Sequence, residues 1–185
     1  MLSRFLRDGA ELVPLEPWQA EEFADHIEGI REHLAPWVGL AWVVIDVDSA
    51  REYLQRYADS QAVDGARIYG IRQDGQLVGG AVFRVFDVRS GNCELGVWLA
   101  PSAQGRGLVT LAAQHMIDWA FDVRGMARVE WRTAVGNDAS AAVAKRLGMT
   151  LEGVLRKEYP INEERQDGEL WTLVSGDRRP WLSAA

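Results

Sequence analysis

The stretch Cys93–Val109 decides the fold, and it reads Cys-Glu-Leu-Gly-Val-Trp-Leu-Ala-Pro-Ser-Ala-Gln-Gly-Arg-Gly-Leu-Val. This order predicts a strand, a glycine-containing turn and the first turn of a helix. Such a turn presents several free backbone N–H groups, and the helix dipole adds positive potential in front of them. The stretch therefore predicts a phosphate site, although a tight strand–helix turn that needs glycine would read in the same way.

Length and composition indicate a single globular domain over residues 1–185. The chain is 48% hydrophobic and 25% charged, which is ordinary for a soluble protein. Its formal net charge of −7 disfavours a general nucleic-acid binder, because such a protein needs a basic face. The charge suits a cationic partner such as a protein amine, although solubility alone also explains it. With no membrane-length apolar run, no signal peptide and one cysteine, we expect a cytoplasmic protein.

Hydrophobic periodicity predicts an α/β fold with a mixed central sheet of about seven strands and about four flanking helices. The predicted strands are residues 11–15, 66–72, 77–86, 92–99, 127–133, 149–155 and 169–175. The predicted helices are residues 18–30, 53–61, 108–123 and 138–147. Ser49 and Glu52 are expected to form a capping box before the second helix. Residues 33–42 predict a loop rich in tryptophan, and residues 158–167 predict a polar loop.

The turn Gln104–Gly107 differs from the two best-known phosphate-binding motifs. It lacks the Lys-Ser/Thr ending of a P-loop, and Thr110 stands where a dinucleotide fingerprint has its third glycine. On the preceding strand, alternation places Glu94 and Trp98 on one face and a row of apolar side chains on the other. Gly96 in mid-strand indicates that another group comes close to the backbone.

A second motif lies at the start of the last predicted helix. Asn137 and Ser140 are three residues apart, so both can face the same side of the helix. The same two residues could also be simple caps of that helix. Leu147-Gly148-Met149 follows at the helix end.

Together these motifs resemble the GNAT acyltransferase superfamily over nearly the whole chain. The family's phosphate-loop pattern appears as Gln104-x-x-Gly107, with Val109 in the final small position. Its Asn-x-x-Ser and Leu-Gly-Phe motifs appear as Asn137-x-x-Ser140 and Leu147-Gly148-Met149. The RimJ/RimL type, which acetylates protein N-termini, is the most similar branch. Its features appear as His33-Leu34-x-Pro36-Trp37, Glu94-Leu95-Gly96-Val97-Trp98-Leu99 and Leu151-Glu152-Gly153-Val154-Leu155-Arg156.

The resemblance implies acetyl-CoA, or another acyl-CoA, as co-substrate and no metal ion. It implies that Asn137 holds the pantetheine arm, and that the backbone of Val97, Trp98 and Leu99 pairs with the pantetheine amides like an added strand. It also implies a pyrophosphate site made by the backbone N–H groups of Gln104, Gly105, Arg106, Gly107 and Leu108.

The implied reaction is direct attack of an amine on the thioester, which needs a base for the amine and a donor for the leaving thiolate. Many family members use a tyrosine as the acid, and Ala144 stands at that position here. Ser140 resembles the serine that RimL-type members use in this role, and it would donate a hydrogen bond to the thiolate. Glu94 is the predicted base, acting through a water, although it could equally be a structural carboxylate.

The expected acceptor is the N-terminal α-amine of a protein. At pH 7 about 10% of an α-amine is in the neutral form that attacks the thioester, compared with about 0.04% of a lysine. A site with a single carboxylate base therefore suits the α-amine better. His33, Trp37 and Tyr53 are predicted to line the acceptor pocket, and core packing is the alternative for the aromatic residues. A small-molecule amine or a lysine as acceptor, succinyl-CoA as donor, and a non-catalytic CoA sensor remain open. The eight tryptophans leave room for an apolar homodimer surface.

Overall fold

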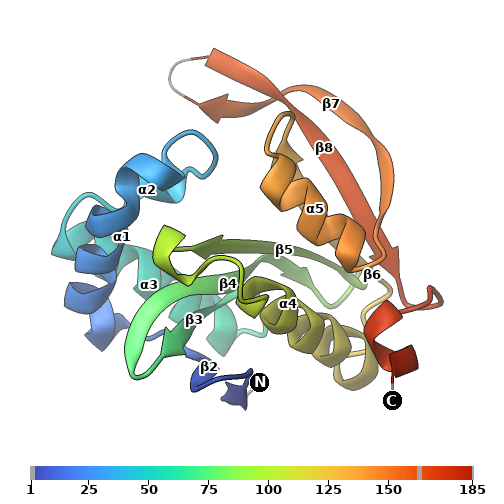
Figure 1. Cartoon of the computed structure of the whole chain (residues 1–185), viewed down its shortest axis with the longest axis horizontal. Coiled ribbons are helices and arrows are strands. Elements are labelled where there is room, and N and C mark those ends of the chain that lie inside the picture. Colours follow the sequence, from blue (N-terminus) through green and yellow to red (C-terminus); the bar gives the residue numbers. More distant parts are fainter. Residues whose placement is uncertain (1–2, 162–163, 185) are drawn as a thin grey trace.

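The structure, a computed structural model, describes residues 3–161 and 164–184. These residues form one mixed sheet with the strand order β1-β2-β3-β4-β5-β6-β8-β7 (Figure 1). Neighbouring strands are antiparallel except for β5 and β6, which are parallel. The strands are β1 (Arg4–Phe5), β2 (Ala10–Pro14), β3 (Arg67–Gln73), β4 (Gln76–Asp87), β5 (Asn92–Leu99), β6 (Arg128–Ala134), β7 (Thr150–Ile161) and β8 (Glu164–Val174). The predicted mixed α/β sheet is confirmed, with β1 as an additional short strand.

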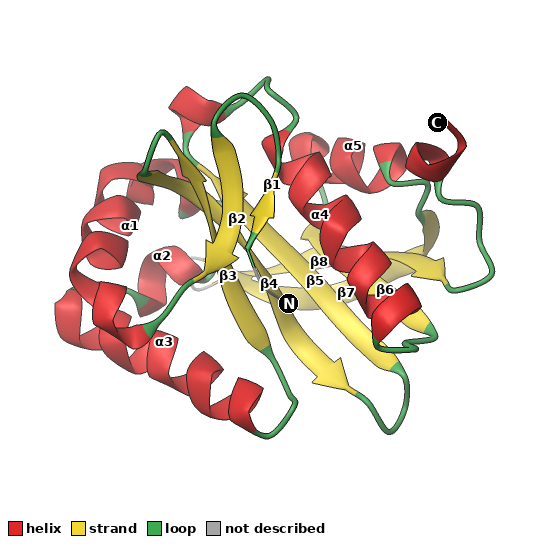
Figure 2. Cartoon of the chain, turned by 90° about the horizontal axis from the view of Figure 1, so that it is seen from below, coloured by secondary structure: helices red, strands yellow, loops and turns green. Residues whose placement is uncertain are grey.

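Helices cover both faces of the sheet (Figure 2). The helices are α1 (Ala20–Leu34), α2 (Leu40–Val43), α3 (Val47–Ala62), α4 (Leu108–Asp118) and α5 (Asp138–Arg146). A π-helical turn, Trp119–Val123, continues α4. One face of the sheet carries α1, α2 and α3, and the other carries α4 and α5.

Two hydrophobic cores fill the space between the sheet and these helices. Under α1 and α3 lie Phe23, Ile27, Leu54 and Trp98. Under α4 and α5 lie Leu95, Leu108, Met116 and Trp131. Because β5 supplies Leu95 to one core and Trp98 to the other, its predicted alternation is confirmed. Burying one such large side chain stabilises the fold by about 1.5–3 kcal/mol.

The predicted capping box of Ser49 and Glu52 is wrong. Helix α3 begins earlier, and Asp46 is its N-cap residue. The Asp46 carboxylate accepts a hydrogen bond from the backbone N–H of Ser49 at 2.7 Å, and the Ser49 hydroxyl accepts one from the backbone N–H of Asp46 at 3.0 Å. Aspartate is a better cap than the serine three residues later, because its charge also interacts favourably with the helix dipole.

Two predicted loops contain regular structure. Residues 33–42 include the end of α1 and the start of α2. The polar segment 158–167, apart from 162–163, which lie outside the described residues, forms the far ends of β7 and β8. Tyr159 pairs there with Gln166 and Pro160 with Arg165. This hairpin end reaches beyond the two cores, so its strands carry no apolar alternation that the sequence could reveal.

The Trp98 side chain packs between Gly80 of β4 and His26 of α1. A Cβ on Gly80 would lie 2.1 Å from Cη2 of the Trp98 ring, so only glycine leaves room for the indole. On α1, His26 Nε2 accepts a hydrogen bond from Trp98 Nε1 at 3.3 Å. Burial lowers the pKa of His26 to about 4, against smaller opposing effects of Glu22 and the Leu77 backbone. His26 is therefore neutral in the folded protein at pH 7.

We expect His26 to make folding sensitive to mild acid. The unfolded chain binds a proton at this residue below pH 6.5 and the folded chain only near pH 4, so the free energy of unfolding falls as the pH drops through this window. The shift corresponds to about 3 kcal/mol in all. Urea unfolding of wild type and of His26→Gln, at several pH values between 7.5 and 5, measures this change in the free energy of unfolding. The stability advantage of wild type should shrink with falling pH, and parallel curves would contradict this assignment.

Candidate active site

The sheet opens between its two parallel strands. β5 pairs with β4 along its whole length, from Asn92 to Leu99. With β6 it pairs only at Asn92, Cys93 and Glu94. In the part of the chain that the structure describes, no strand pairs with residues 95–99 of β5 on this side. Their backbone N–H and C=O groups on this side are therefore available to an extended ligand, which would pair as an added strand.

The glycine turn lies directly beyond the open end of β5. Gly105 and Gly107 have φ angles of 77° and 73°, in the left-handed region that favours glycine. Gly107 is also the N-cap residue of α4, and the first helical hydrogen bond to its carbonyl comes from Leu111. The backbone N–H groups of residues 108–110 consequently have no partner within the helix.

Space for a ligand lies in front of this turn. A Cβ built on Gly105 would meet no atom within 4 Å. The turn and the helix dipole together can hold an anion there. Gly105 and Gly107 make the turn tight, and the same backbone conformation directs its N–H groups outward. The turn can therefore be both a tight strand–helix connection and a phosphate site. We call residues 104–108 the phosphate loop.

Asn137 and Ser140 lie at the start of α5. Asn137 Oδ1 accepts a hydrogen bond from the backbone N–H of Ser140 at 3.1 Å, so Asn137 does cap the helix. Its side-chain NH₂ group remains a donor. Ser140 Oγ accepts a hydrogen bond from Trp131 Nε1 at 3.0 Å, and Trp131 is almost fully buried. This fixed acceptor contact orients the hydroxyl and leaves its proton for another partner. One turn further, Ala144 is buried in the core.

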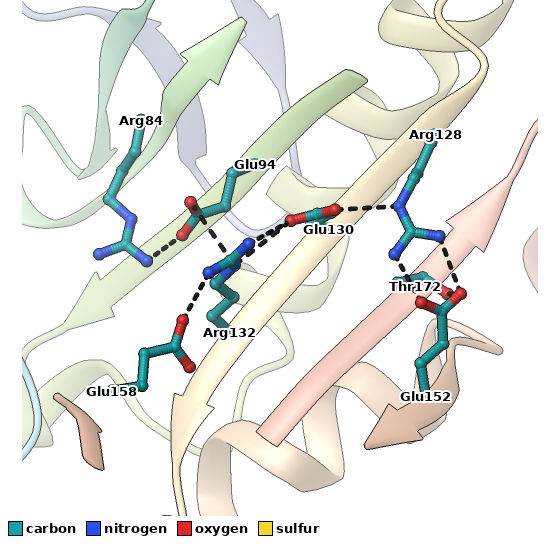
Figure 3. A network of polar contacts seen from close by, with 8 residues as sticks. All are labelled: Arg84, Glu94, Arg128, Glu130, Arg132, Glu152, Glu158 and Thr172. Carbon is teal, nitrogen blue, oxygen red and sulfur yellow. Dashed lines mark hydrogen bonds and ion pairs between the residues drawn. The ribbon is translucent and has the colours of Figure 1, made fainter. Parts of the chain in front are cut away.

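Glu94 lies in a network of charges at the point where β5 and β6 separate (Figure 3). A bulge between Phe83 and Val85 of β4 lies beside Arg84, which forms an ion pair with Glu94 Oε1. Glu94 Oε2 lies 3.9 Å from Arg132 Nε of β6. Both carboxylate oxygens of Glu94 therefore face a guanidinium group, and Glu94 as the base stays a prediction.

In Glu158 of β7, as in Glu94, one carboxylate oxygen accepts a hydrogen bond from an arginine, and the other accepts none from the described residues. Glu158 Oε1 bonds to Arg132 (Figure 3), whereas the buried Oε2 has no hydrogen-bond partner among those residues. The hydroxyl of the neighbouring Tyr159 is also buried, and it lies beside the guanidinium of Arg84. A register shift between Leu155 and Tyr159 produces this arrangement. Both side chains pack against Gly168 of β8, where an added Cβ would lie 2.2 Å from Oε2 of Glu158 and 2.9 Å from the Tyr159 ring.

Sequence reasoning missed Glu158. It lies in the segment expected to be a polar loop, and the bulge breaks the two-residue period by which a strand face is recognised. A carboxylate within a polar run was the only signal that could have singled it out.

The three predicted acceptor residues lie in different surroundings. His33 Nε2 is 3.0 Å from Nε2 of Gln104, so His33 contacts the phosphate loop. Tyr53 packs against Phe23 and Tyr57, with ring centroids 6.0 Å and 5.2 Å apart. Burial raises the pKa of Tyr53 well above its ordinary value, so it is un-ionised. Trp37 is half-buried after α1, and its backbone N–H bonds to Leu34. A shared acceptor pocket lined by His33, Trp37 and Tyr53 stays a prediction.

Residues 3–161 and 164–184 lack two further features. No group of three or more His, Cys, Asp or Glu side chains there is placed to hold a metal ion. In the same residues, no helix combines the length and the apolar character that crossing a membrane requires.

An open strand edge, an adjoining phosphate loop and a nearby hydroxyl together define a site for an acyl-CoA. The family described as the acetyltransferase (GNAT) domain matches residues 11–150. The chain belongs to this family and is an acetyl-CoA-dependent N-acetyltransferase. The open β5 edge fits the pantetheine amides of CoA, and the space before Gly105 fits its pyrophosphate.

Relatives of known sequence carry the same activity in their names. The putative ribosomal N-acetyltransferase YdaF of Bacillus subtilis (strain 168) is 30% identical over 172 residues, which are 90% of each chain. The ribosomal-protein-serine acetyltransferase of Escherichia coli (strain K12) is 28% identical over 109 residues, 59% of this chain and 61% of that protein.

Solved structures share the fold. The microcin C7 self-immunity acetyltransferase MccE, in complex with acetyl-CoA and AMP, is 25% identical with a TM-score of 0.86, covering 91% of this chain and 94% of that one. RimL, a ribosomal L7/L12 α-N-protein acetyltransferase in complex with CoA, is 21% identical with a TM-score of 0.86, covering 94% and 98%. The GNAT fold expected from the motifs is thus confirmed.

Proposed function

We propose that this enzyme transfers the acetyl group of acetyl-CoA to the N-terminal α-amine of a protein, with ribosomal proteins as the first candidates. The observation that carries the proposal is the opening between β5 and β6, along which the backbone of residues 95–99 has no strand partner on this side within the described residues. The names of the relatives in Bacillus subtilis and Escherichia coli support a ribosomal acceptor.

In the proposed mechanism, acetyl-CoA supplies an activated acyl group as a thioester. The phosphate loop holds the pyrophosphate, and the backbone of Val97, Trp98 and Leu99 holds the pantetheine amides. The Asn137 NH₂ group donates to the same arm. These contacts fix the thioester and reduce the attack to an effectively unimolecular step.

Glu158 serves as the proposed base. The amine nitrogen attacks the thioester carbonyl carbon, a C–N bond forms and the C–S bond breaks. The proton lost by the amine passes to the carboxylate of Glu158. Glu94 then has a positioning role, because its contacts with Arg84 and Arg132 hold those guanidinium groups in place.

Ser140 completes the proposed mechanism on the opposite side. Its hydroxyl donates a hydrogen bond to the departing CoA sulfur while accepting one from Trp131. A serine hydroxyl is a poor acid, so its contribution is stabilisation of the thiolate, which solvent then protonates. The products are the N-acetylated chain and CoA.

A peptide panel tests the proposal. We expect purified enzyme to release CoA thiol with acetyl-CoA and peptides carrying a free N-terminus taken from ribosomal proteins. The matched control peptides have a blocked N-terminus and an internal lysine. Turnover on the blocked peptides would contradict the proposal and make a lysine the acceptor. Turnover on spermidine alone would make a small amine the acceptor. CoA binding without turnover on any amine would instead support a CoA sensor.

The cytoplasmic location and the homodimer remain predictions. An N-terminal acetyltransferase acting on ribosomal proteins meets them in the cytoplasm, which supports the first. Light scattering of the purified chain tests the second, with a mass near 41 kDa expected for a dimer of the 20.6 kDa chain.

A further inference from the structure

The hairpin of β7 and β8 contains a residue in an unusual backbone conformation, directly before Glu158. Among the described residues other than glycine, four have a positive φ angle. Three of these are aspartates, Asp8, Asp64 and Asp74, and the fourth is Lys157 with a φ of 55°. Aspartate enters the left-handed region readily because its short side chain can hydrogen-bond locally, whereas a lysine there is strained. Such strain persists only where surrounding contacts hold it.

Two side chains of β8 hold Lys157 in this conformation. Oδ1 of Asp167 accepts a hydrogen bond from the backbone N–H of Lys157 at 2.8 Å. Arg165 Nε donates one to the backbone oxygen of Lys157, also at 2.8 Å. The backbone oxygen of Asp167 accepts a further hydrogen bond at 2.9 Å from the N–H of Val135, which lies between β6 and α5. Asp167 is thus fixed through its backbone, and its side chain fixes Lys157.

The contacts on Lys157 hold a bulge in β7. The register shift between Leu155 and Tyr159 leaves residues 156–158 of β7 opposite Asp167 alone. Bulges re-aim the side chains of their strand and are common beside active sites. This one ends at Glu158, whose carboxylate accepts a hydrogen bond from a guanidinium group of β6 (Figure 3). The direction of the Glu158 side chain therefore depends on the bulge.

We propose that Asp167 and Arg165 are positioning residues, which hold the bulge so that the Glu158 carboxylate stays where β5 and β6 separate. This inference rests on Glu158 as the proposed base and names the groups that place it. Gly168 of β8 contributes by leaving room, because a Cβ at that residue would overlap with Oε2 of Glu158.

Steady-state kinetics with a free N-terminal peptide test the effect on the reaction. We expect Asp167→Ala to lower kcat about five- to tenfold, as loss of one restraining hydrogen bond predicts, with the KM for acetyl-CoA within about twofold. In the Glu158→Gln background the same substitution should change kcat less than about twofold, since Asp167 acts through Glu158. Lys157→Gly added to Asp167→Ala should recover part of kcat, because glycine adopts a positive φ without strain.

Asp177→Ala is the matched control for Asp167→Ala. Asp177 is also exposed, and its Oδ2 accepts a hydrogen bond from the backbone N–H of Val174 at 3.0 Å, at the other end of β8. The control removes the same kind of contact from the same hairpin without reaching the bulge. We expect it to leave kcat within about twofold of wild type.

A spectroscopic measurement tests the bulge without any turnover. The chain has two lysines, Lys145 in α5 and Lys157, so ¹⁵N-lysine labelling gives two backbone amide signals, which Lys157→Arg assigns. In Asp167→Ala we expect the Lys157 amide proton to exchange with solvent about fivefold faster or more, because its acceptor is gone. The Lys145 amide should keep its rate and serves as the internal reference.

The two measurements separate the outcomes. An unchanged Lys157 amide in Asp167→Ala would overturn the inference. Equal losses of kcat in the wild-type and Glu158→Gln backgrounds would overturn it as well, because Asp167 would then act on something other than Glu158. If Glu158→Gln keeps the wild-type kcat, or if no peptide is acetylated, the proposed function fails at that point. The lysine signal then decides by itself whether Asp167 holds the bulge.

Discussion

The Glu158→Gln variant should turn over about 100-fold or more slowly than wild type, in the range that removal of a general base produces. Glutamine keeps the shape of the side chain and can still accept a hydrogen bond from Arg132, but it cannot take the proton of the amine. We therefore expect kcat to fall while the KM for acetyl-CoA stays within about twofold. Steady-state kinetics with a free N-terminal peptide measure both constants.

Two other carboxylates of the same network provide the controls for Glu158→Gln. Glu152 is also on β7, and its oxygens are bonded to Arg128 and Thr172, so Glu152→Gln should leave kcat nearly unchanged. Glu94→Gln should lower kcat by less than Glu158→Gln, because it only loosens Arg84 and Arg132. If Glu94→Gln is instead the more damaging change, the base is Glu94.

The second large effect is expected for Ser140→Ala. Removing one donor to a developing negative charge lowers kcat by about 10²–10³-fold in well-preorganised sites. The KM for acetyl-CoA should change little, because the hydroxyl acts on the sulfur only as it departs. Ser140→Thr keeps a hydroxyl and should recover part of the activity. A Ser140→Ala variant with wild-type kcat would remove Ser140 from this role.

A stability measurement must accompany Ser140→Ala. The substitution leaves Trp131 Nε1 buried without an acceptor, which costs about 1–3 kcal/mol. The double variant with Trp131→Phe removes that unpaired donor together with the hydroxyl. If the double variant regains stability and stays slow, the loss of rate belongs to the chemistry and not to the fold.

Much of the fold could be predicted because local patterns and tertiary structure agree. Residues 92–99 alternate because the core under α4 and α5 takes every second side chain of β5, from Cys93 to Leu99, whereas Trp98 enters the other core. Gly105 and Gly107 could be recognised because a positive φ leaves glycine as the favoured residue. These features depend on neighbours in the sequence, which is the information that a single chain provides.

The rest of the site depends on contacts between distant residues. Glu158 meets Arg132 across 26 positions of sequence, and Arg84 meets Glu94 through a bulge that no periodicity reveals. Arg84 and Arg132 lie far apart in the sequence, although both contact the carboxylate of Glu94. His33 similarly contacts Gln104 across 71 positions. The sequence therefore predicts the strand and the glycine turn, which local patterns define, and misses the ion pairs that form between distant strands.

The parting of β5 from β6 has a consequence for self-association. A strand without a neighbour is an exposed edge, and exposed edges invite pairing with other chains. Here such an edge lies within the sheet, and proteins commonly guard edges with bulges and charged side chains. Arg84, Glu94 and Arg132 stand at its beginning, next to a bulge. The same charged residues that frame the proposed chemistry thus also discourage a foreign strand from entering the slot that the cofactor needs.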